Sequence, residues 1–248
     1  MKTTGRNIAL LLAGGKSERM GASIPKQYIE VDGENVLLHT MKAFQRHPLI
    51  DDIYVVCAPE WEAAVRSECA KGAIDKFRQT IEGGSTAFKS IVNGIQALAA
   101  AETQPNDIVL VHDAVRPLLT QEIISGNVST CRRYGNAITA IGSHEAFAVS
   151  ADGHDSDRFV PREGMYRAQT PHTFRMSCLK EILDMTHEAG ITESQSLFTL
   201  ANEVGFAPLH LTPGDILNFK ITRPSDIDIY RALKGRKKVS TYRVRTRP

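Results

Sequence analysis

The sequence predicts an α/β fold, in which a mainly parallel, twisted sheet has helices on both faces and an antiparallel arm projects from it. Short apolar runs at residues 8–12, 53–58, 108–111 and 137–141 indicate buried strands. Segments of helical character lie between them, and this alternation is typical of a parallel sheet covered on both faces. The chain of 248 residues has a hydrophobic content of 42%, which suits one domain with a substantial core.

Helices are expected in most of the intervening segments. The clearest follows a glycine pair at residues 83–84, because Ala87, Ile91 and Ile95 recur every four residues on one face. A last helix is expected to be capped by Ser225. The other expected helices span residues 36–44, 61–69, 121–134, 176–189 and 194–204, and extended segments are expected at 207–211 and 219–222.

Residues 143–164 differ in character from the rest of the chain. Their hydrophobic alternation is weak, and they contain Asp152-Gly153, a dipeptide typical of hairpin turns. An antiparallel arm that projects from the main sheet is therefore expected here. A single domain is expected over residues 1–233, with this arm included.

Residues 234–248 form a basic C-terminal tail with seven Lys and Arg residues and no acid. The rest of the chain holds 23 basic and 28 acidic residues, so the body is net negative although the whole chain has a net charge of +2. A basic tail is typical either of a solvated end or of a segment that binds nucleic acid or an anionic surface. A solvated end is the expectation, and nucleic acid is not expected as a partner.

The composition favours a cytoplasmic protein with no membrane partner. No apolar run approaches the roughly 18 residues of a membrane span, and the run at residues 8–13 is short for a signal peptide. The cysteines, Cys57, Cys69, Cys131 and Cys178, are widely spaced and form no C-x-x-C pair. This spacing indicates free thiols in a reducing compartment and not zinc ligands.

A glycine-rich loop with three cations follows the first expected strand. It has the sequence AGGKSERMG at residues 13–21, and a Pro-Lys-Gln triplet follows at residues 25–27. Open α/β sheets bind ligands beyond the carboxyl ends of their strands, which is where this loop begins. Glycines let backbone N–H groups approach phosphate oxygens, and Lys16, Arg19 and Lys26 supply positive charge. The loop therefore predicts a site for a nucleoside triphosphate.

Two better-known glycine loops are excluded by single residues. A P-loop that ended in Gly15-Lys16-Ser17 would need a glycine at Leu10. The dinucleotide fingerprint fails because Lys16 occupies its second glycine position. The remaining alternative to a nucleotide site is an ordinary strand-to-helix turn with solvated charges.

The sequence VHDAVRP at residues 111–117 is the second motif with chemical meaning. It places Asp113 at the end of a buried strand, facing the loop after the first strand. A carboxylate there is suited to hold Mg²⁺, which prefers oxygen ligands and would bridge triphosphate oxygens. Arg116 is expected to contact a phosphate or the loop. The alternative is an aspartate that caps the following turn, with Arg116 as its ion-pair partner.

Together these motifs resemble the cytidylyltransferase family that contains the 2-C-methyl-D-erythritol 4-phosphate and ribitol-5-phosphate cytidylyltransferases. The resemblance runs from about residue 8 to residue 233. It implies a nucleotide-diphospho-sugar transferase-like fold and transfer of a nucleotide from CTP to a polyol phosphate, with Mg²⁺ as cofactor and isoprenoid biosynthesis as one expected role. Further matching segments are Gly83-Gly84 with Ser90, Arg162 before Met165-Tyr166, Gln169-Thr170-Pro171 with Phe174, Ile191-Thr192-Glu193, and residues 218–222, NFKIT.

The resemblance implies roles for individual residues on the nucleotide side. Arg19 and Lys26 would grip the triphosphate, Lys26 would stabilise the charge of the transition state, and Lys220 would contact phosphate at the reacting centre. Asp113 would ligate Mg²⁺, and Arg116 would contact a phosphate or the glycine-rich loop. The cytosine and ribose would be held by Ala13, Gly14, Gly15, Gly83, Gly84 and Ser90.

The resemblance also implies an acceptor site that two subunits share. Arg162 and Thr192 would bind the phosphate of the acceptor, and Glu145 is the candidate acceptor oxygen for its hydroxyls. In the family, the counterpart of Arg162 lies on the projecting arm and reaches the active site of a partner subunit. A homodimer is therefore expected.

Three departures from the family pattern affect these expectations. The family usually has an arginine where this chain has Ala87, and Lys89 lacks the planar fork of an arginine. The usual Asp-Thr pair of the arm is replaced in residues 143–147, SHEAF, and the usual Thr-Asp is Thr192-Glu193. The nucleotide half therefore matches better than the polyol half. The AGG sequence at residues 13–15 and residues 165–171 lean toward the ribitol-type branch.

Other functions remain as alternatives. One is a nucleotidyltransferase that uses another nucleotide or a sugar phosphate. Another is a silent nucleotide-binding regulator, in which Ala87 has abolished turnover and the basic tail binds nucleic acid. The histidines at positions 112, 144, 154, 172 and 210 are scattered, which favours ordinary hydrogen-bonded roles over metal ligation or base catalysis.

Overall fold

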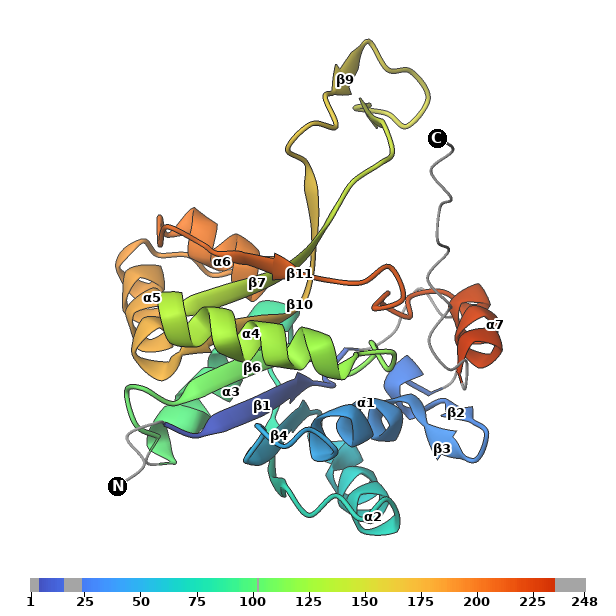
Figure 1. Ribbon diagram of the computed structural model, residues 1–248, viewed down its shortest axis with the longest axis vertical. Coiled ribbons are helices and arrows are strands. Elements are labelled where there is room, and N and C mark those ends of the chain that lie inside the picture. The colour runs from blue at the N-terminus through green and yellow to red at the C-terminus, as the bar shows by residue number, and fades with distance from the viewer. Residues whose placement is uncertain (1–4, 16–23, 102, 235–248) are drawn as a thin grey trace, which may run out of the picture.

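The computed structural model describes residues 5–15, 24–101 and 103–234. Its centre is a seven-stranded sheet with the order β11-β7-β10-β6-β1-β4-β5 (Figure 1). The strands are β1 (Asn7–Leu12), β4 (Asp52–Cys57), β5 (Phe77–Glu82), β6 (Ile108–Asp113), β7 (Asn136–Gly142), β10 (Tyr166–Arg175) and β11 (Leu211–Pro213). Strands β5, β4, β1 and β6 pair in parallel, as β11 and β7 do, whereas β10 is antiparallel to both β6 and β7. The predicted mainly parallel sheet is confirmed.

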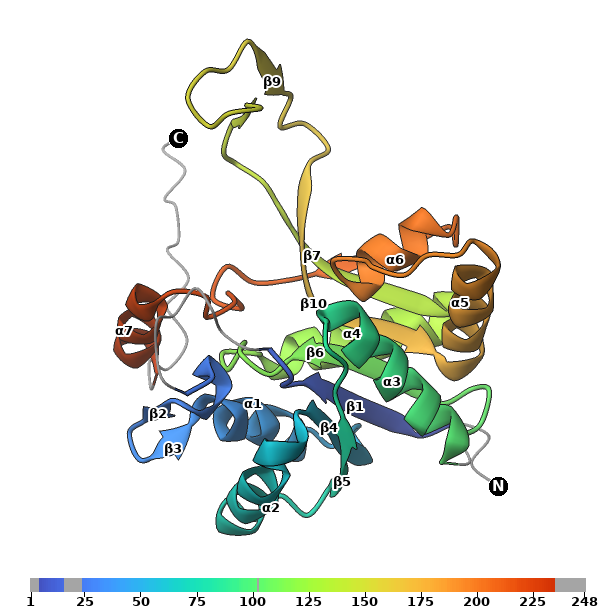
Figure 2. The ribbon, with the colours of Figure 1, turned by 180° about the vertical axis from the view of Figure 1, so that it is seen from behind.

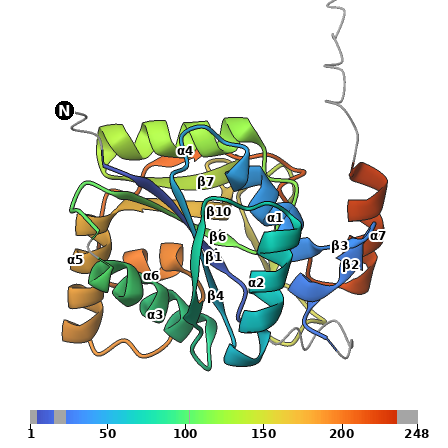
Figure 3. The ribbon, with the colours of Figure 1, turned by 90° about the horizontal axis from the view of Figure 1, so that it is seen from below.

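Helices cover both faces of the sheet, as the alternating pattern predicted. One face is covered by α1 (Val36–Gln45), α2 (Glu62–Lys71) and α4 (Gln121–Tyr134), and the other by α3 (Ala87–Ala100), α5 (Met176–Glu188) and α6 (Leu197–Glu203) (Figures 1 and 2). Figure 3 shows the two helix layers on either side of the strands. Successive side chains of a strand point to opposite faces. Ala9 and Leu11 of β1 therefore pack into one layer, and Ile8 and Leu10 into the other.

Local sequence sets the ends of the helices. Asn35, Thr86 and Thr120 cap α1, α3 and α4, each accepting a hydrogen bond from the backbone N–H three residues on. Helix α4 ends at Gly135, whose φ of 90° is the left-handed conformation that glycine adopts without strain. The chain then enters β7 at once, which explains why the bounds of α4 were predictable.

Three local predictions were wrong. The last helix, α7 (Pro224–Leu233), has Arg223 as its N-cap and not Ser225. Asp226 stabilises this start, because its carboxylate accepts hydrogen bonds from the backbone N–H groups of Thr222 (2.7 Å) and Arg223 (2.8 Å). Of the segments expected to be extended at 207–211 and 219–222, only Leu211 joins the sheet, because strand β11 spans Leu211–Pro213 and residues 219–222 are irregular.

Strand β10 was not predicted from the sequence, and two further features had no clear sequence signal. Strand β5 lies at the edge of the sheet and exposes most of its side chains, so its sequence FRQTIE lacks a buried strand's apolar run. A hairpin of β2 (Glu30–Val31) and β3 (Glu34–Asn35) turns through Asp32 and Gly33, which both have positive φ. Short 3₁₀ turns at Lys26–Tyr28 and Pro59–Trp61 complete this part.

Helix α7 packs on the β2–β3 hairpin and holds the chain after residue 218 beside the sheet. Ile227 and Tyr230 share a small apolar cluster with Val31, Val36 and Ile221. The backbone N–H of Ile221 donates to the carbonyl of Val115 at 2.9 Å. This packing fixes the segment that precedes α7 at the carboxyl ends of β1 and β6.

The expected arm leaves the sheet after β7 and returns in β10. It contains a small antiparallel pair, β8 (Phe147–Val149) and β9 (Arg158–Val160), and projects far from the sheet (Figure 1). Its aromatic side chains are exposed, and Phe159 has 73% of its surface open to solvent. Among the residues that the structure describes, no helix combines the length and the apolar content that a bilayer span requires. All four cysteines are free thiols.

A buried polar network joins α4 to the sheet and gives a stability prediction. Asn127 donates to the carbonyl of Ile123 (2.9 Å) and to Thr139 Oγ1 (2.8 Å), and it accepts from Thr173 Oγ1 (2.9 Å). Asn127→Ala leaves the buried Thr173 hydroxyl without its acceptor and removes two further buried hydrogen bonds, so it should lower the free energy of unfolding by about 2 kcal/mol. Urea denaturation measures this loss.

Asn202→Ala is the matched control for Asn127→Ala. Asn202 makes the same kind of bond, to the carbonyl of Phe198 four residues earlier (2.8 Å), but on the exposed surface of α6. Water replaces that bond, so the change in unfolding free energy should stay within about 0.5 kcal/mol. Equal losses in the two variants would contradict a special contribution from the buried network.

Candidate active site

A cavity of about 640 Å³ opens at the carboxyl ends of β1 and β6. Its described lining comes from residues 14–15 after β1, residues 84–91 at the start of α3, the beginning of β10, and the segment before α7. The charged side chains that line it are Lys26, Asp113, Arg116 and Lys220. Elements far apart in the sequence thus bring three cations and one carboxylate to one place.

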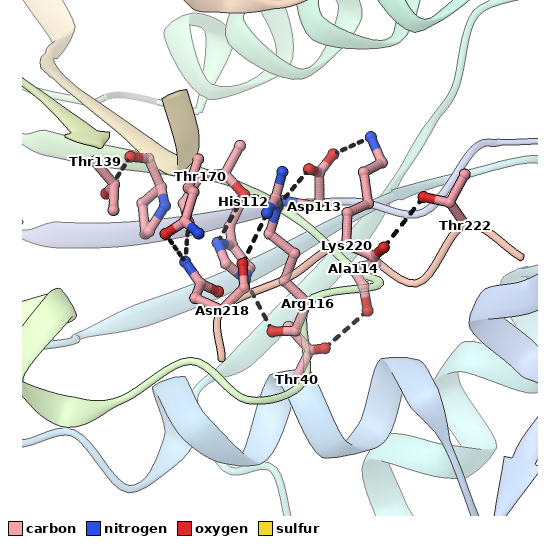
Figure 4. Close-up of polar contacts among 12 residues, drawn as sticks. Thr40, His112, Asp113, Ala114, Arg116, Thr139, Thr170, Asn218, Lys220 and Thr222 are labelled. Carbon is pink, nitrogen blue, oxygen red and sulfur yellow. Dashed lines mark hydrogen bonds and ion pairs between the residues drawn. The ribbon is translucent and has the colours of Figure 1, made fainter. Parts of the chain in front are cut away.

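Asp113 lies between two of these cations (Figure 4). Its Oδ2 accepts from Arg116 Nε at 2.9 Å, and its Oδ1 accepts from Lys220 Nζ at 3.0 Å. Burial raises the pKa of Asp113, but the charges and hydrogen bonds of Lys220 and Arg116 outweigh burial and hold the pKa well below its usual range. The carboxylate is therefore ionised at neutral pH. The ion pair with Arg116 expected under the alternative interpretation is present, and Lys220 is a second partner.

A chain of hydrogen bonds behind Asp113 fixes the turn. The backbone N–H of Asp113 donates to Thr170 Oγ1 (3.1 Å), which leaves the Thr170 hydroxyl hydrogen for His112 Nδ1 (3.0 Å). His112 Nε2 then donates to the carbonyl of Arg116 (3.3 Å). Burial lowers the pKa of His112 to about 3, so its imidazole is neutral and this tautomer is the one that satisfies every group.

Asn218 ties the segment before α7 to the same turn. Its side-chain amide donates to the carbonyl of Thr170 (2.8 Å), and its own carbonyl accepts from Arg116 Nη1 (2.8 Å). These bonds hold Lys220, two residues later, within reach of Asp113 (Figure 4). The NFKIT segment is thus held in place by its buried asparagine.

The glycine loop is held from beneath by the triplet at residues 25–27. The Gln27 side-chain amide donates to the carbonyls of Ala13 (2.6 Å) and Gly15 (3.0 Å). Gly14 and Gly15 line the cavity, whereas Ala13 is buried behind them. Lys16 and Arg19 lie outside the described residues, so their predicted roles are not placed by the structure.

The second glycine pair lies beside this loop, since a Cβ on Gly14 and one on Gly83 would both meet Ser90 Oγ, at 3.2 Å and 3.3 Å. The backbone N–H of Gly84 donates to Ser90 Oγ (3.1 Å), and both residues line the cavity. A Cβ on Gly84 would lie 2.8 Å from the backbone carbon of Lys89, so this close approach requires glycine. Gly83 lies behind the lining and pairs with Cys57 through its backbone N–H (2.8 Å).

The residues expected to bind the acceptor are not brought to this cavity within one chain. Glu145 and Arg162 are exposed on the arm, and Thr192 is exposed in the loop between α5 and α6. None of the three is among the described lining residues. Ala87 does line the cavity, whereas Lys89 lies outside it, with Nζ 3.3 Å from Ser85 Oγ.

Comparison with known proteins identifies the family. A family model described as 2-C-methyl-D-erythritol 4-phosphate cytidylyltransferase matches residues 7–234. The chain belongs to this family. It is 30% identical to the ribitol-5-phosphate cytidylyltransferase of Lacticaseibacillus paracasei, over 90% of this chain and 96% of that protein. It is 31% identical to the 2-C-methyl-D-erythritol 4-phosphate cytidylyltransferase of Geotalea uraniireducens, over 90% and 94%.

Solved structures give the same result for the fold. A crystal structure of 4-diphosphocytidyl-2C-methyl-D-erythritol synthase matches with a TM-score of 0.76 and 29% identity, covering 93% of this chain and 98% of that one. The protein is therefore a cytidylyltransferase, as its motifs indicated, and the predicted fold class is confirmed.

The carboxylate of this cytidylyltransferase is suited to Mg²⁺ bound together with a nucleotide. Among the described residues, no group of three or more acidic, His or Cys side chains could hold a metal ion alone. Mg²⁺ is commonly held by one or two carboxylates, with phosphate oxygens and water as the other ligands. Each Asp113 oxygen accepts one hydrogen bond and keeps a lone pair for a metal. Asp113 therefore fits an ion that arrives with a triphosphate.

Two further lining residues of the cytidylyltransferase were not predicted as site residues, since the sequence favoured an ordinary hydrogen-bonded role for His172 and gave none to Gln195. His172, on β10, and Gln195, in the loop before α6, both face the cavity. His172 stands directly after the Gln169-Thr170-Pro171 motif, and that position was the available signal. The sequence held no signal for Gln195, because a single glutamine in a loop belongs to no recognisable motif.

The buried imidazole of His172 gives a prediction for the pH dependence of stability. Burial, with the nearby charges of Arg116 and Lys220, lowers its pKa to about 4 from the usual 6.5. Between these values the unfolded chain binds a proton and the folded protein does not, so stability falls as pH drops from 6.5 to 4. His172→Gln removes this loss. From pH 6.5 to 4.5 the variant should lose about 2 kcal/mol less unfolding free energy than the parent protein.

Urea denaturation at both pH values tests the His172 prediction. His187→Gln, on the exposed surface of α5, is the matched control and should leave the pH dependence as it is. Identical pH dependence in the parent and in His172→Gln would show that the folded protein protonates this imidazole.

Proposed function

We propose that the protein joins CTP to a polyol phosphate, giving a CDP-polyol and pyrophosphate. The observation that supports this most is the cluster of Asp113, Arg116 and Lys220, with Lys26, in a cavity with one wall made of glycines. Such a wall suits a nucleoside, and the cations suit its phosphates. Ribitol 5-phosphate is the favoured acceptor, because residues 13–15 and 165–171 resemble that branch, and 2-C-methyl-D-erythritol 4-phosphate is the other candidate.

The reaction needs charge neutralisation more than a protein nucleophile. A phosphate oxygen of the acceptor attacks the α-phosphorus of CTP in line, and the new P–O bond forms as the bond to the bridging oxygen of the β-phosphate breaks. Pyrophosphate leaves with that oxygen. Two anions must meet, and negative charge builds up on the leaving group. Arg19, Lys26 and Lys220 are proposed to stabilise that charge.

Asp113 is proposed to hold Mg²⁺ against the triphosphate, with Arg116 fixing the carboxylate. The metal would neutralise phosphate charge when bound. Lys220, whose Nζ lies 3.0 Å from Asp113 Oδ1, is proposed to bind the reacting phosphates beside that carboxylate. The cytosine and ribose are assigned to the wall formed by Ala13, Gly14, Gly15, Gly83, Gly84 and Ser90.

The acceptor site is proposed to be completed by a second copy of the chain. The arm projects from the sheet with exposed aromatic side chains, which is typical of a surface that a partner covers. Arg162 on the arm would reach the partner's cavity and bind the acceptor phosphate with Thr192, and Glu145 would accept from its hydroxyls. The free thiols of the chain fit a reducing, cytoplasmic location.

Pyrophosphate release from CTP, Mg²⁺ and a panel of polyol phosphates tests the proposal. Turnover with ribitol 5-phosphate or 2-C-methyl-D-erythritol 4-phosphate is the expected outcome. Turnover only with a sugar phosphate or another nucleotide would replace the proposed substrates. CTP binding without turnover on any acceptor would favour a regulator, in which Ala87 marks the lost arginine.

Lys26 gives the clearest kinetic prediction. Its side chain is largely buried at the edge of the cavity, so its charge acts where water screens it poorly. Lys26→Ala should lower kcat by roughly 10²–10³, as loss of one preorganised charge stabiliser does. Lys180→Ala, on the exposed surface of α5, is the control for lysine removal and should keep normal turnover. Normal turnover in Lys26→Ala would exclude the transition-state role.

Subunit complementation tests the shared acceptor site. Arg162→Ala and Lys26→Ala should each be nearly inactive, because every site lacks one group. In a mixed dimer, one site lacks both groups and the other is intact. Equal amounts of the two variants, unfolded and refolded together, should therefore regain about a quarter of the parent activity. No gain over the separate variants would place Arg162 in the site of its own chain.

A further inference from the structure

The order of the strands divides the cavity into two halves. Asp113 ends β6, which lies between β1 and β10 in the sheet. The glycine segments follow β1 and β5, on one side of Asp113. Strand β10 and the loop before α6 lie on the other side. If the glycines hold the nucleoside and the cations hold the phosphates, the β10 half faces the acceptor, so the inference below rests on the proposed function.

Most polar side chains along the described lining are already committed within the protein. Gln27 holds the glycine loop, Gln169 bonds to Asp215, and Thr170 bonds to His112. Further side chains with a partner are Ser85, Thr86, Ser90, Ser196 and Thr222. Among the described residues of the lining, His172 and Gln195 are the polar side chains that make no hydrogen bond within the chain.

His172 is an unpartnered polar group that is almost fully buried in the cavity wall. Only 5% of its surface is exposed. Burial and the charges of Arg116 and Lys220 hold its pKa at about 4, so the ring is neutral at physiological pH. A neutral imidazole offers one donor and one acceptor. The ring lines the cavity and its nitrogens are not enclosed by the chain, so a ligand in the cavity can use both capacities.

Gln195 lies on the same wall. It stands three residues before Phe198, whose ring centroid is 6.1 Å from that of His172. Its exposed amide offers two donors and one acceptor oxygen. Both side chains line the cavity, in the half beyond Asp113.

We propose that Gln195 and His172 form a neutral subsite that binds the hydroxyl groups of the polyol chain and so helps to select the acceptor. Each side chain presents a donor and an acceptor, and a hydroxyl group also donates and accepts. A phosphate accepts only, and the cations on the other side of the cavity already match it. This subsite lies within one chain and adds to whatever the arm of a second copy contributes.

Steady-state kinetics with ribitol 5-phosphate, or with whichever polyol phosphate turns over, tests the subsite. Gln195→Ala and His172→Phe each remove hydrogen bonding, and the phenylalanine keeps the ring volume. Each should raise the KM for the acceptor about 5- to 10-fold and leave the KM for CTP within about 2-fold. His172→Gln restores one donor and one acceptor, so it should recover part of the acceptor affinity that His172→Phe loses.

Acceptor analogues that each lack one hydroxyl group separate a binding role from a structural one. A structural defect in a variant would not change its preference among these analogues. The parent protein should prefer the full polyol phosphate over the analogue that lacks the bound hydroxyl. In Gln195→Ala this preference should shrink toward equality for one analogue and persist for the others. Gln96→Ala, on the exposed surface of α3, is the matched control and should keep every preference.

An unchanged acceptor KM in both Gln195→Ala and His172→Phe would overturn the inference, as would an equal rise in the KM for CTP. Failure of the proposed function has a different signature. In that case the unsubstituted protein would release no pyrophosphate with any polyol phosphate, and the hydroxyl subsite would be rejected with it.

Discussion

The placement of Asp113 between Arg116 and Lys220 is the constraint on which the site depends. One carboxylate at the end of a buried strand holds two cations that would otherwise repel each other. Without that anion, the gathering of Lys26, Arg116 and Lys220 in one partly buried cavity would be electrostatically costly. The same carboxylate is the group suited to a metal. Asp113 therefore lowers the electrostatic cost of bringing these cations together during folding. The net charge of the cluster stays positive, which suits a triphosphate.

The fold achieves this with buried hydrogen bonds and not with further charges. Thr170 and His112 connect β10 to the turn that contains Asp113, and Asn218 connects that turn to the segment before α7. His112 is neutral because it is buried, so it supports the turn without altering the charge of the site. The turn that carries Asp113 and Arg116 is thus held by neutral groups.

The cavity also separates the two tasks of a nucleotidyltransferase. Its glycine wall lets a planar base lie close to the backbone, and its β10 wall offers polar side chains with unused hydrogen-bonding capacity. Under the proposed function, a change in acceptor specificity requires changes near β10, α6 and the arm, and leaves the proposed phosphate-binding centre intact. This division fits the sequence departures, which fall mainly on the polyol half.

Much of this protein follows from its sequence alone. The apolar runs specified four central strands because such runs are buried on both faces, and α4 was predictable to the residue because its cap, its final glycine and its periodicity agree. The residue types of the glycine loop and the HDAVRP motif predicted a nucleoside triphosphate site, and nucleotide transfer followed from their resemblance to the cytidylyltransferases. By contrast, edge strand β5, the start of α7 and the partnership of Lys220 with Asp113 were decided by tertiary structure. Each depends on a residue distant in the chain, as Lys220 and Asp113 are separated by 107 positions in the sequence. The free hydrogen-bonding capacity of His172 also emerged only from packing, because whether a polar side chain is satisfied depends on what the fold places around it.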